Sequence, residues 1–207
     1  MQILSLSGSP STLSRSAWML HFAQQHLDPQ AERSRHVALR DLPPQALVTA
    51  DTRDPAVSAA LSAVAEAEVL IVATPIYKAA YSGLLKVFLD LLPQDGLRGK
   101  TVLPLATGGS LAHLLALDYA LKPVLSALGA RDILDGVFAT DAQLVSDGKG
   151  NYTADAALAT RLERALAPLQ TRAQTRAQVP VASRPDLRSL TPQAVILAPP
   201  EGLRCPA

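Results

Sequence analysis

Apolar residues are distributed along the chain in two alternating patterns. Short unbroken runs of branched apolar residues, such as the one over 68–74, are typical of strands covered on both faces in a parallel sheet. Between these runs, apolar residues recur at helical spacing. The predicted strands cover 2–6, 34–39, 68–74, 101–106 and 132–139, and the predicted helices cover 14–27, 55–67, 83–92, 112–128 and 154–170. Five alternating β and α units predict an α/β fold with a doubly wound parallel sheet and helices on both faces.

The pattern changes near residue 175. Prolines then recur too often for a long helix, at Pro180, Pro185, Pro192, Pro199, Pro200 and Pro206. We therefore expect one domain over 1–174 and a Pro-rich C-terminal arm or disordered tail over 175–207. Apolar residues within 178–191 favour docking of that stretch on another surface, such as a neighbouring subunit.

The composition describes a well-buried globular chain without strong charge. Of its 207 residues, 48% are hydrophobic and 18% are charged, and the mean hydropathy is +0.17. The net charge of +1 gives no overall attraction to nucleic acid or anionic lipid, so neither is an expected partner. Residues 1–8 lack the features of a secretion signal and no apolar run is long enough to span a membrane, so we expect a cytoplasmic protein.

The sequence offers no candidate metal or disulfide site. Cys205 is the only cysteine, which excludes an internal disulfide and a thiolate cluster. His21, His26 and His36 do not have metal-ligand spacing with carboxylates or cysteine. We therefore expect no bound metal.

The first candidate loop suits a phosphate group. Residues 7–16 (SGSPSTLSRS) follow the first predicted strand and open the first predicted helix. Backbone N–H groups at a helix start, several hydroxyl groups and the Arg15 guanidinium all favour an anion there. The alternative is an ordinary Ser-rich turn with a helix cap. The loop has neither the Gly-Lys-Ser/Thr end of a Walker loop nor the Gly-x-Gly-x-x-Gly pattern of a dinucleotide fold.

Two further loops follow strands three and four. Residues 75–83 (PIYKAAYSG) carry two of the four tyrosines, and residues 106–110 (ATGGS) carry paired glycines. Ligands of open parallel sheets bind outside the carboxyl ends of the strands, so the three loops should form one crevice. The alternatives are that Tyr77 and Tyr81 only pack at the sheet edge and that the glycines form a plain turn. A crevice with a phosphate end and a flat polar end matches the shape of flavin mononucleotide (FMN).

On these residues, the chain resembles the NADPH-dependent FMN reductase family of flavodoxin-like fold. The resemblance covers residues 1 to about 170. It is carried most clearly by segments 75–83, 103–109 (LPLATGG) and 112–125 (AHLLALDYALKPVL). These segments are most similar to the FMN reductases of two-component alkanesulfonate monooxygenase systems. The resemblance implies a flavodoxin-like three-layer sandwich with a five-stranded parallel sheet of order 2-1-3-4-5. It also implies NADPH-dependent reduction of FMN to FMNH₂, which a partner flavin-dependent alkanesulfonate monooxygenase uses to release sulfite.

The resemblance also assigns site residues by position. The phosphate loop is matched by Ser9, Ser14, Arg15 and Ser16, and the ring-binding loops by Pro75, Ile76, Tyr77, Lys78, Gly108 and Gly109. Tyr119 matches an inserted tyrosine that widens a helix at a subunit interface near the flavin; the alternative is a core or interface aromatic. Pro123 independently predicts a bend in this helix. The NADPH 2′-phosphate is expected near Arg15 or Lys78, and the expected assembly is a homotetramer.

Hydride passes directly from a nicotinamide to a flavin, so we expect no catalytic acid, base or nucleophile. His113 is accordingly expected to be a capping or interface residue. Two alternatives share the fold: a flavin-retaining NAD(P)H reductase of quinones, azo dyes or metal oxyanions, and a flavodoxin-type electron carrier. A phosphorylatable receiver domain is disfavoured, because it needs an aspartate where the third strand ends at Thr74.

Overall fold

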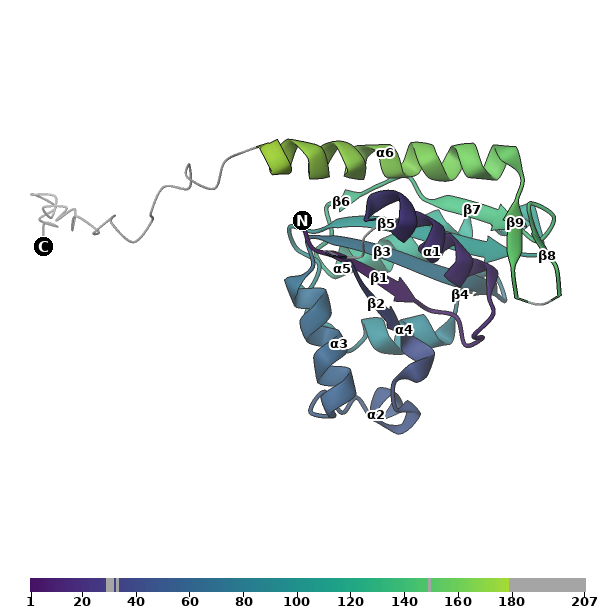
Figure 1. Cartoon of the computed structure of the whole chain (residues 1–207). Coiled ribbons are helices and arrows are strands. Elements are labelled where there is room, and N and C mark those ends of the chain that lie inside the picture. The colour runs from purple at the N-terminus through teal and green to yellow at the C-terminus, as the bar shows by residue number, and fades with distance from the viewer. Residues whose placement is uncertain (29–31, 33, 149, 179–207) are drawn as a thin grey trace, which may run out of the picture.

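The computed structural model describes residues 1–28, 32, 34–148 and 150–178 (Figure 1). The last helix, α6 (Ala156–Gln178), is longer than the predicted helix over 154–170 and continues past the expected domain boundary at 174. The remainder of the expected arm or tail, residues 179–207, lies outside the described residues.

A parallel sheet forms the centre of the molecule. Its main path runs through β2 (Ser34–Ala38), β1 (Ile3–Ser7), β3 (Val69–Tyr77), β5 (Thr101–Gly108) and β6 (Asp132–Ile133). Counted by the five β units of the sequence, this order is 2-1-3-4-5, which is the flavodoxin-like order. The predicted fold class is therefore confirmed.

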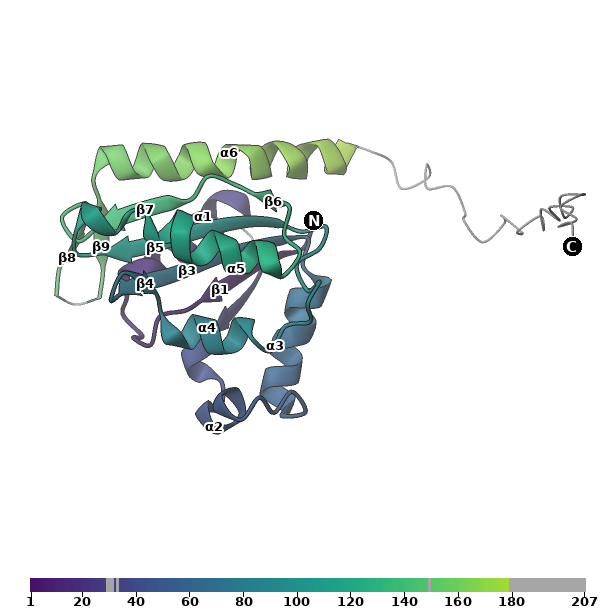
Figure 2. The same ribbon diagram turned by 180° about the vertical axis from the view of Figure 1, so that it is seen from behind.

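Helices cover both faces of the sheet because successive strand residues point to opposite sides. Ile71 of β3 belongs to a core shared with α1 (Arg15–Leu27) and α6. Its neighbour Leu70 belongs to the core on the other face. That face is covered by α3 (Pro55–Glu66), α4 (Gly83–Leu89) and α5 (Lys122–Ala127) (Figure 1, Figure 2). Burial on both faces explains why the central strands read as unbroken apolar runs.

The segment after strand three differs from the expected loop over 75–83. β3 continues to Tyr77 and pairs antiparallel with β4 (Ala80–Tyr81). The turn between them is formed by Lys78 and Ala79, both with positive φ, 49° and 65°. Ile76 and Tyr77 have strong strand propensity, so Pro75 does not end the strand.

We expect Ala79→Gly to stabilise the protein by about 0.5–1 kcal/mol, because the left-handed backbone strains alanine but not glycine. The measurement is the midpoint of urea unfolding. Ala80→Gly is the control, because Ala80 is paired in β4. Glycine there should destabilise the strand instead, and equal effects of the two substitutions would contradict the strain argument.

Two other predicted elements are divided in the structure. The fifth strand, expected over 132–139, is split into β6 and β7 (Val137–Thr140), both of which pair with β5. Gly136 lies in the break, where an added Cβ would be 2.8 Å from the Pro104 carbonyl oxygen. The helix expected over 112–128 is divided into a 3₁₀ turn, η2, a π-helix, η3, and α5; their bounds are Leu111–His113, Leu117–Leu121 and Lys122–Ala127.

The π-helix contains Tyr119 at its centre, so the local widening implied by the resemblance is present. Besides β4, four short elements have no counterpart among the predicted ones. They are η1 (Leu39–Asp41), α2 (Pro44–Val48), β8 (Leu144–Ser146) and β9 (Tyr152–Ala154). β8 and β9 pair as an antiparallel hairpin after the central sheet.

A polar cluster ties α6 to the amino-terminal edge of the sheet. Arg172 Nη1 donates to Thr101 Oγ1 and to the Asp132 carboxylate, and Thr101 Oγ1 donates to Asp132 Oδ2 at 2.7 Å. The Arg172 guanidinium, followed by the Thr101 hydroxyl, lowers the pKa of Asp132.

A group whose pKa is lowered by folding stabilises the protein above its unfolded pKa and loses that effect as the pH falls. The difference in unfolding free energy between the native protein and Asp132→Asn should therefore shrink as the pH drops below about 4. Urea unfolding at several pH values measures this difference. A difference that stays constant between pH 7 and pH 3 would contradict the assignment.

Candidate functional site

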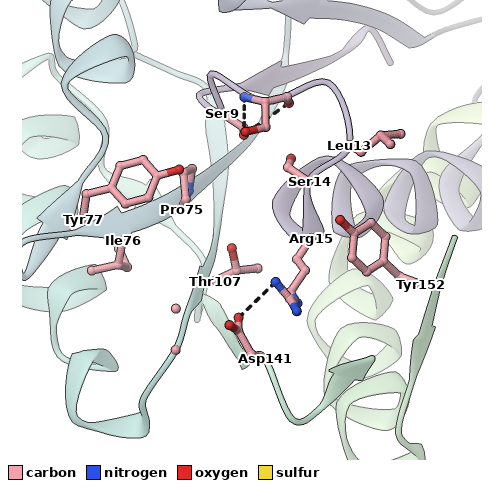
Figure 3. Close-up of a pocket in the computed structure, with 13 residues that line it drawn as sticks. Ser9, Leu13, Ser14, Arg15, Pro75, Ile76, Tyr77, Thr107, Asp141 and Tyr152 are labelled. Atoms are coloured by element: carbon pink, nitrogen blue, oxygen red, sulfur yellow. Dashed lines mark hydrogen bonds and ion pairs between the residues drawn. The ribbon is translucent and has the colours of Figure 1, made fainter. Parts of the chain in front are cut away.

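A crevice of about 240 Å³ opens at the carboxyl ends of the central strands, as expected for a parallel sheet (Figure 3). The carboxyl ends of β1, β3, β5 and β7, the start of α1 and the β8–β9 hairpin surround it. Its lining consists of Ser9, Ser11, Leu13, Ser14, Arg15, Pro75, Ile76, Tyr77, Thr107, Gly108, Gly109, Asp141 and Tyr152.

Most of the residues assigned from the sequence meet in this crevice. Those that line it are Ser9, Ser14, Arg15, Pro75, Ile76, Tyr77, Gly108 and Gly109. Three do not line it. Ser16 is fully buried, with its Oγ 3.3 Å from that of Ser14; Lys78 lies in the β3–β4 turn; and Tyr119 is 78% exposed on the π-helix.

The loop after β1 is closed by its own serines. The Ser9 hydroxyl is buried and accepts a hydrogen bond from the Ser11 N–H at 3.2 Å. The Ser14 Oγ caps α1 by accepting from the Ala17 N–H at 3.1 Å. The first N–H groups of a helix have no partner within the helix, so this end of the crevice offers donors and the positive end of the α1 dipole to an anion.

The loop is also fixed to the neighbouring strand. The Gly8 N–H donates to the Ala73 carbonyl oxygen at 2.8 Å. An added Cβ on Gly8 would lie 2.9 Å from the Leu85 Cβ, so only glycine allows α4 to approach this closely. The phosphate loop is therefore built against β3 and α4.

Arg15 is held by three contacts from the far side of the crevice. Its Nε donates to the Leu144 carbonyl oxygen at 3.0 Å, and its Nη1 lies 3.4 Å from Asp141 Oδ1 (Figure 3). Its guanidinium carbon lies 5.7 Å from the centre of the Tyr152 ring. The side chain expected to bind a phosphate thus also joins α1 to the β8–β9 hairpin.

The opposite end of the crevice presents backbone and one aromatic face. An added Cβ on Gly108 would lie 3.0 Å from the Phe138 ring. The Phe138 ring therefore favours glycine, which has no side chain, at the end of β5. Tyr77 is 51% exposed beside it. Tyr81, the second tyrosine of the expected loop, does not line the crevice, and burial raises the pKa of its phenol. Bare backbone beside an exposed ring suits a flat ligand.

Five lining residues were not assigned from the sequence: Ser11, Leu13, Thr107, Asp141 and Tyr152. Ser11, Leu13 and Thr107 lie within the loops already identified. Asp141 follows the fifth strand, so the carboxyl-edge rule was sufficient to find it. Tyr152 belongs to a hairpin outside the β/α alternation, and no sequence signal places it at this edge.

Comparison with known proteins identifies the chain's relatives. The sequence pattern of one family, NADPH-dependent FMN reductase, matches residues 1–144. The chain belongs to the NADPH-dependent FMN reductase family. It is similar to "FMN reductase (NADPH)" of Escherichia coli (strain K12), with 49% identity over 167 residues that cover 80% of this chain and 86% of the relative.

Two further members support the assignment. "FMN reductase (NADPH)" of Pseudomonas putida (strain KT2440) is 49% identical over 144 residues, which cover 70% of this chain and 73% of the relative. The solved structure of an apo NADH:FMN oxidoreductase (EMOB) superposes with a TM-score of 0.74 at 41% identity, covering 83% of this chain and 89% of that one. The chain is accordingly an NADPH-dependent FMN reductase in type, with FMN and NADPH as cofactor and substrate.

Among the described residues, no group of three or more His, Cys, Asp or Glu side chains is arranged to hold a metal ion. None of the helices in the same part of the chain is long and apolar enough to cross a membrane.

Proposed function

We propose that this reductase binds FMN in the crevice at the carboxyl edge of the sheet and releases FMNH₂ to a flavin-dependent alkanesulfonate monooxygenase for desulfonation. The observation that carries the proposal is the crevice itself. It joins the hydroxyl-rich start of α1 to a backbone-lined surface between β3 and β5. The link to alkanesulfonates rests on the resemblance of segments 75–83, 103–109 and 112–125.

The residues present fit a flavin phosphate and a flavin ring. Ser9, Ser14 and Arg15, with the first amides of α1, would hold the phosphate, while Ser16 supports the loop through its contact with Ser14. The surface that would receive the ring is formed by Pro75, Ile76, Tyr77, Gly108 and Gly109.

When bound, FMN supplies the electron chemistry by accepting a hydride from NADPH. The protein's part is to position the two reactants and to place backbone donors where negative charge develops. No side chain is needed as an acid or base. His113 lies in the η2 turn and does not line the crevice, so it is not placed to act as an acid or base there.

We further propose a cytoplasmic homotetramer in which Tyr119 lies at a subunit interface near the flavin. Four apolar side chains on or next to η2 and η3 support an interface there, because each is substantially exposed: Leu111, Leu114, Leu115 and Tyr119. For the NADPH 2′-phosphate, Lys78 in the β3–β4 turn is the remaining one of the two expected cations, because the proposal assigns Arg15 to the FMN phosphate.

The test is NADPH oxidation by the purified, flavin-stripped protein with and without added FMN, followed by gel filtration. The proposal expects oxidation that depends on FMN, flavin that separates from the protein on the column, and sulfite release when an alkanesulfonate monooxygenase and its substrate are added. Oxidation that needs a quinone while FMN stays bound would indicate the flavin-retaining alternative. The absence of NADPH oxidation would leave an electron carrier or a role without flavin.

A further inference from the structure

Asp141 places a carboxylate on the wall of the crevice, beside the expected phosphate position. It follows β7, and its Oδ1 lies 3.4 Å from Arg15 Nη1 (Figure 3). The side chains of Asp141 and Arg15 are 52% and 31% exposed, so the pair lies at the crevice and not in the core. A negative charge at this point repels a dianionic ligand, although it would be harmless to a neutral one.

Arg15 does not depend on Asp141 for its orientation. Its Nε donates to the Leu144 carbonyl oxygen at 3.0 Å, and its guanidinium lies over the Tyr152 ring. Both contacts remain if Asp141 loses the ion pair. The Nη1 group is therefore the part of Arg15 for which a carboxylate and a phosphate compete.

We propose that Asp141 competes with the FMN phosphate for Arg15 and thereby weakens FMN binding, so that the flavin exchanges readily. This inference rests on the proposed function, which puts the phosphate at Arg15. A phosphate that displaces the Asp141 carboxylate from Arg15 Nη1 remains close to that carboxylate. The two negative charges then repel each other. An enzyme that passes its flavin to another protein must not bind that flavin too tightly. Asp141 would lower the affinity only for flavins that carry a phosphate.

The test compares Asp141→Asn with the native protein in titrations of oxidised FMN and of riboflavin, followed by flavin fluorescence without NADPH. Asparagine keeps the size of the side chain and removes its charge. We expect the FMN Kd to fall about fivefold, as for the loss of one like charge near a protein surface. The FMN dissociation rate should fall by a similar factor, whereas the riboflavin Kd should not change.

Asp95→Asn is the matched control. Asp95 forms an exposed ion pair with Arg98 at 2.8 Å and does not line the crevice, so its loss changes the net charge equally without acting at the site. Its FMN Kd should equal the native value. Weaker or unchanged FMN binding by Asp141→Asn, or equal tightening for riboflavin, would overturn the inference. Failure of the native protein to bind FMN would instead overturn the proposed function.

Discussion

Replacing Arg15 with alanine should weaken FMN binding by about 1.5–3 kcal/mol, or roughly ten- to 150-fold in Kd, which is the range for hydrogen bonds to charged groups. The reason is the loss of the guanidinium that lines the phosphate end of the crevice. Riboflavin binding should change little, because riboflavin has no phosphate. Parallel titrations of the two flavins measure the effect.

Arg98→Ala serves as the control for this substitution. Arg98 is exposed and pairs with Asp95 away from the crevice. Its replacement removes one positive charge from the protein but no contact from the site. A variant at Arg15 that loses FMN and riboflavin equally would show that the side chain acts only by holding the β8–β9 hairpin. An unchanged FMN Kd would remove Arg15 from the phosphate site.

Replacing Ser82 with alanine should cost about 2–4 kcal/mol of unfolding free energy, the sum of a lost helix cap and a buried carbonyl without its donor. Ser82 is buried; its Oγ accepts from the Leu85 N–H at 3.1 Å to cap α4 and donates to the Gly8 carbonyl oxygen. Its own N–H donates to Thr74 Oγ1 at 3.0 Å. One hydroxyl therefore connects the phosphate loop to α4.

The cost should be visible as a lower midpoint in urea unfolding. Ser110→Ala is the comparison, because Ser110 caps the η2 turn from an exposed position through a 3.2 Å bond from the Ala112 N–H. It should cost less than about 1 kcal/mol. Similar losses in the two variants would show that the bond to Gly8 adds nothing to stability.

The sequence was a good guide wherever burial alone determines the element. The runs that became β1, β3 and β5 are covered on both faces, and such strands have an apolar pattern that no exposed segment shares. Their order then followed from the family resemblance, and the position of the crevice followed from the strand ends. Eight of the eleven assigned residues line the crevice because they lie at the carboxyl ends of those strands or in the loops that follow them.

Three features of the site could not be predicted, because they depend on contacts between residues far apart in the sequence or on a turn without its usual residues. The β3–β4 hairpin turns through two non-glycine residues with positive φ, Lys78 and Ala79, where the usual Asn-Gly signal is missing. Arg15 bonds to Leu144, which is 129 positions later in the chain, so its restraint by the β8–β9 hairpin cannot be seen in the loop sequence. Ser16 matches the family pattern but is fully buried, and its Oγ contacts that of Ser14 instead of lining the crevice.

The structure of the protein with FMN tests the central claim most directly. The account predicts the phosphate at Ser9, Ser14, Arg15 and the first amides of α1, and the flavin ring against Tyr77, Gly108 and Gly109. It would be contradicted by a phosphate bound away from the start of α1, or by FMN in a different cavity, such as the one of about 290 Å³ that α6 and residues 134–137 line.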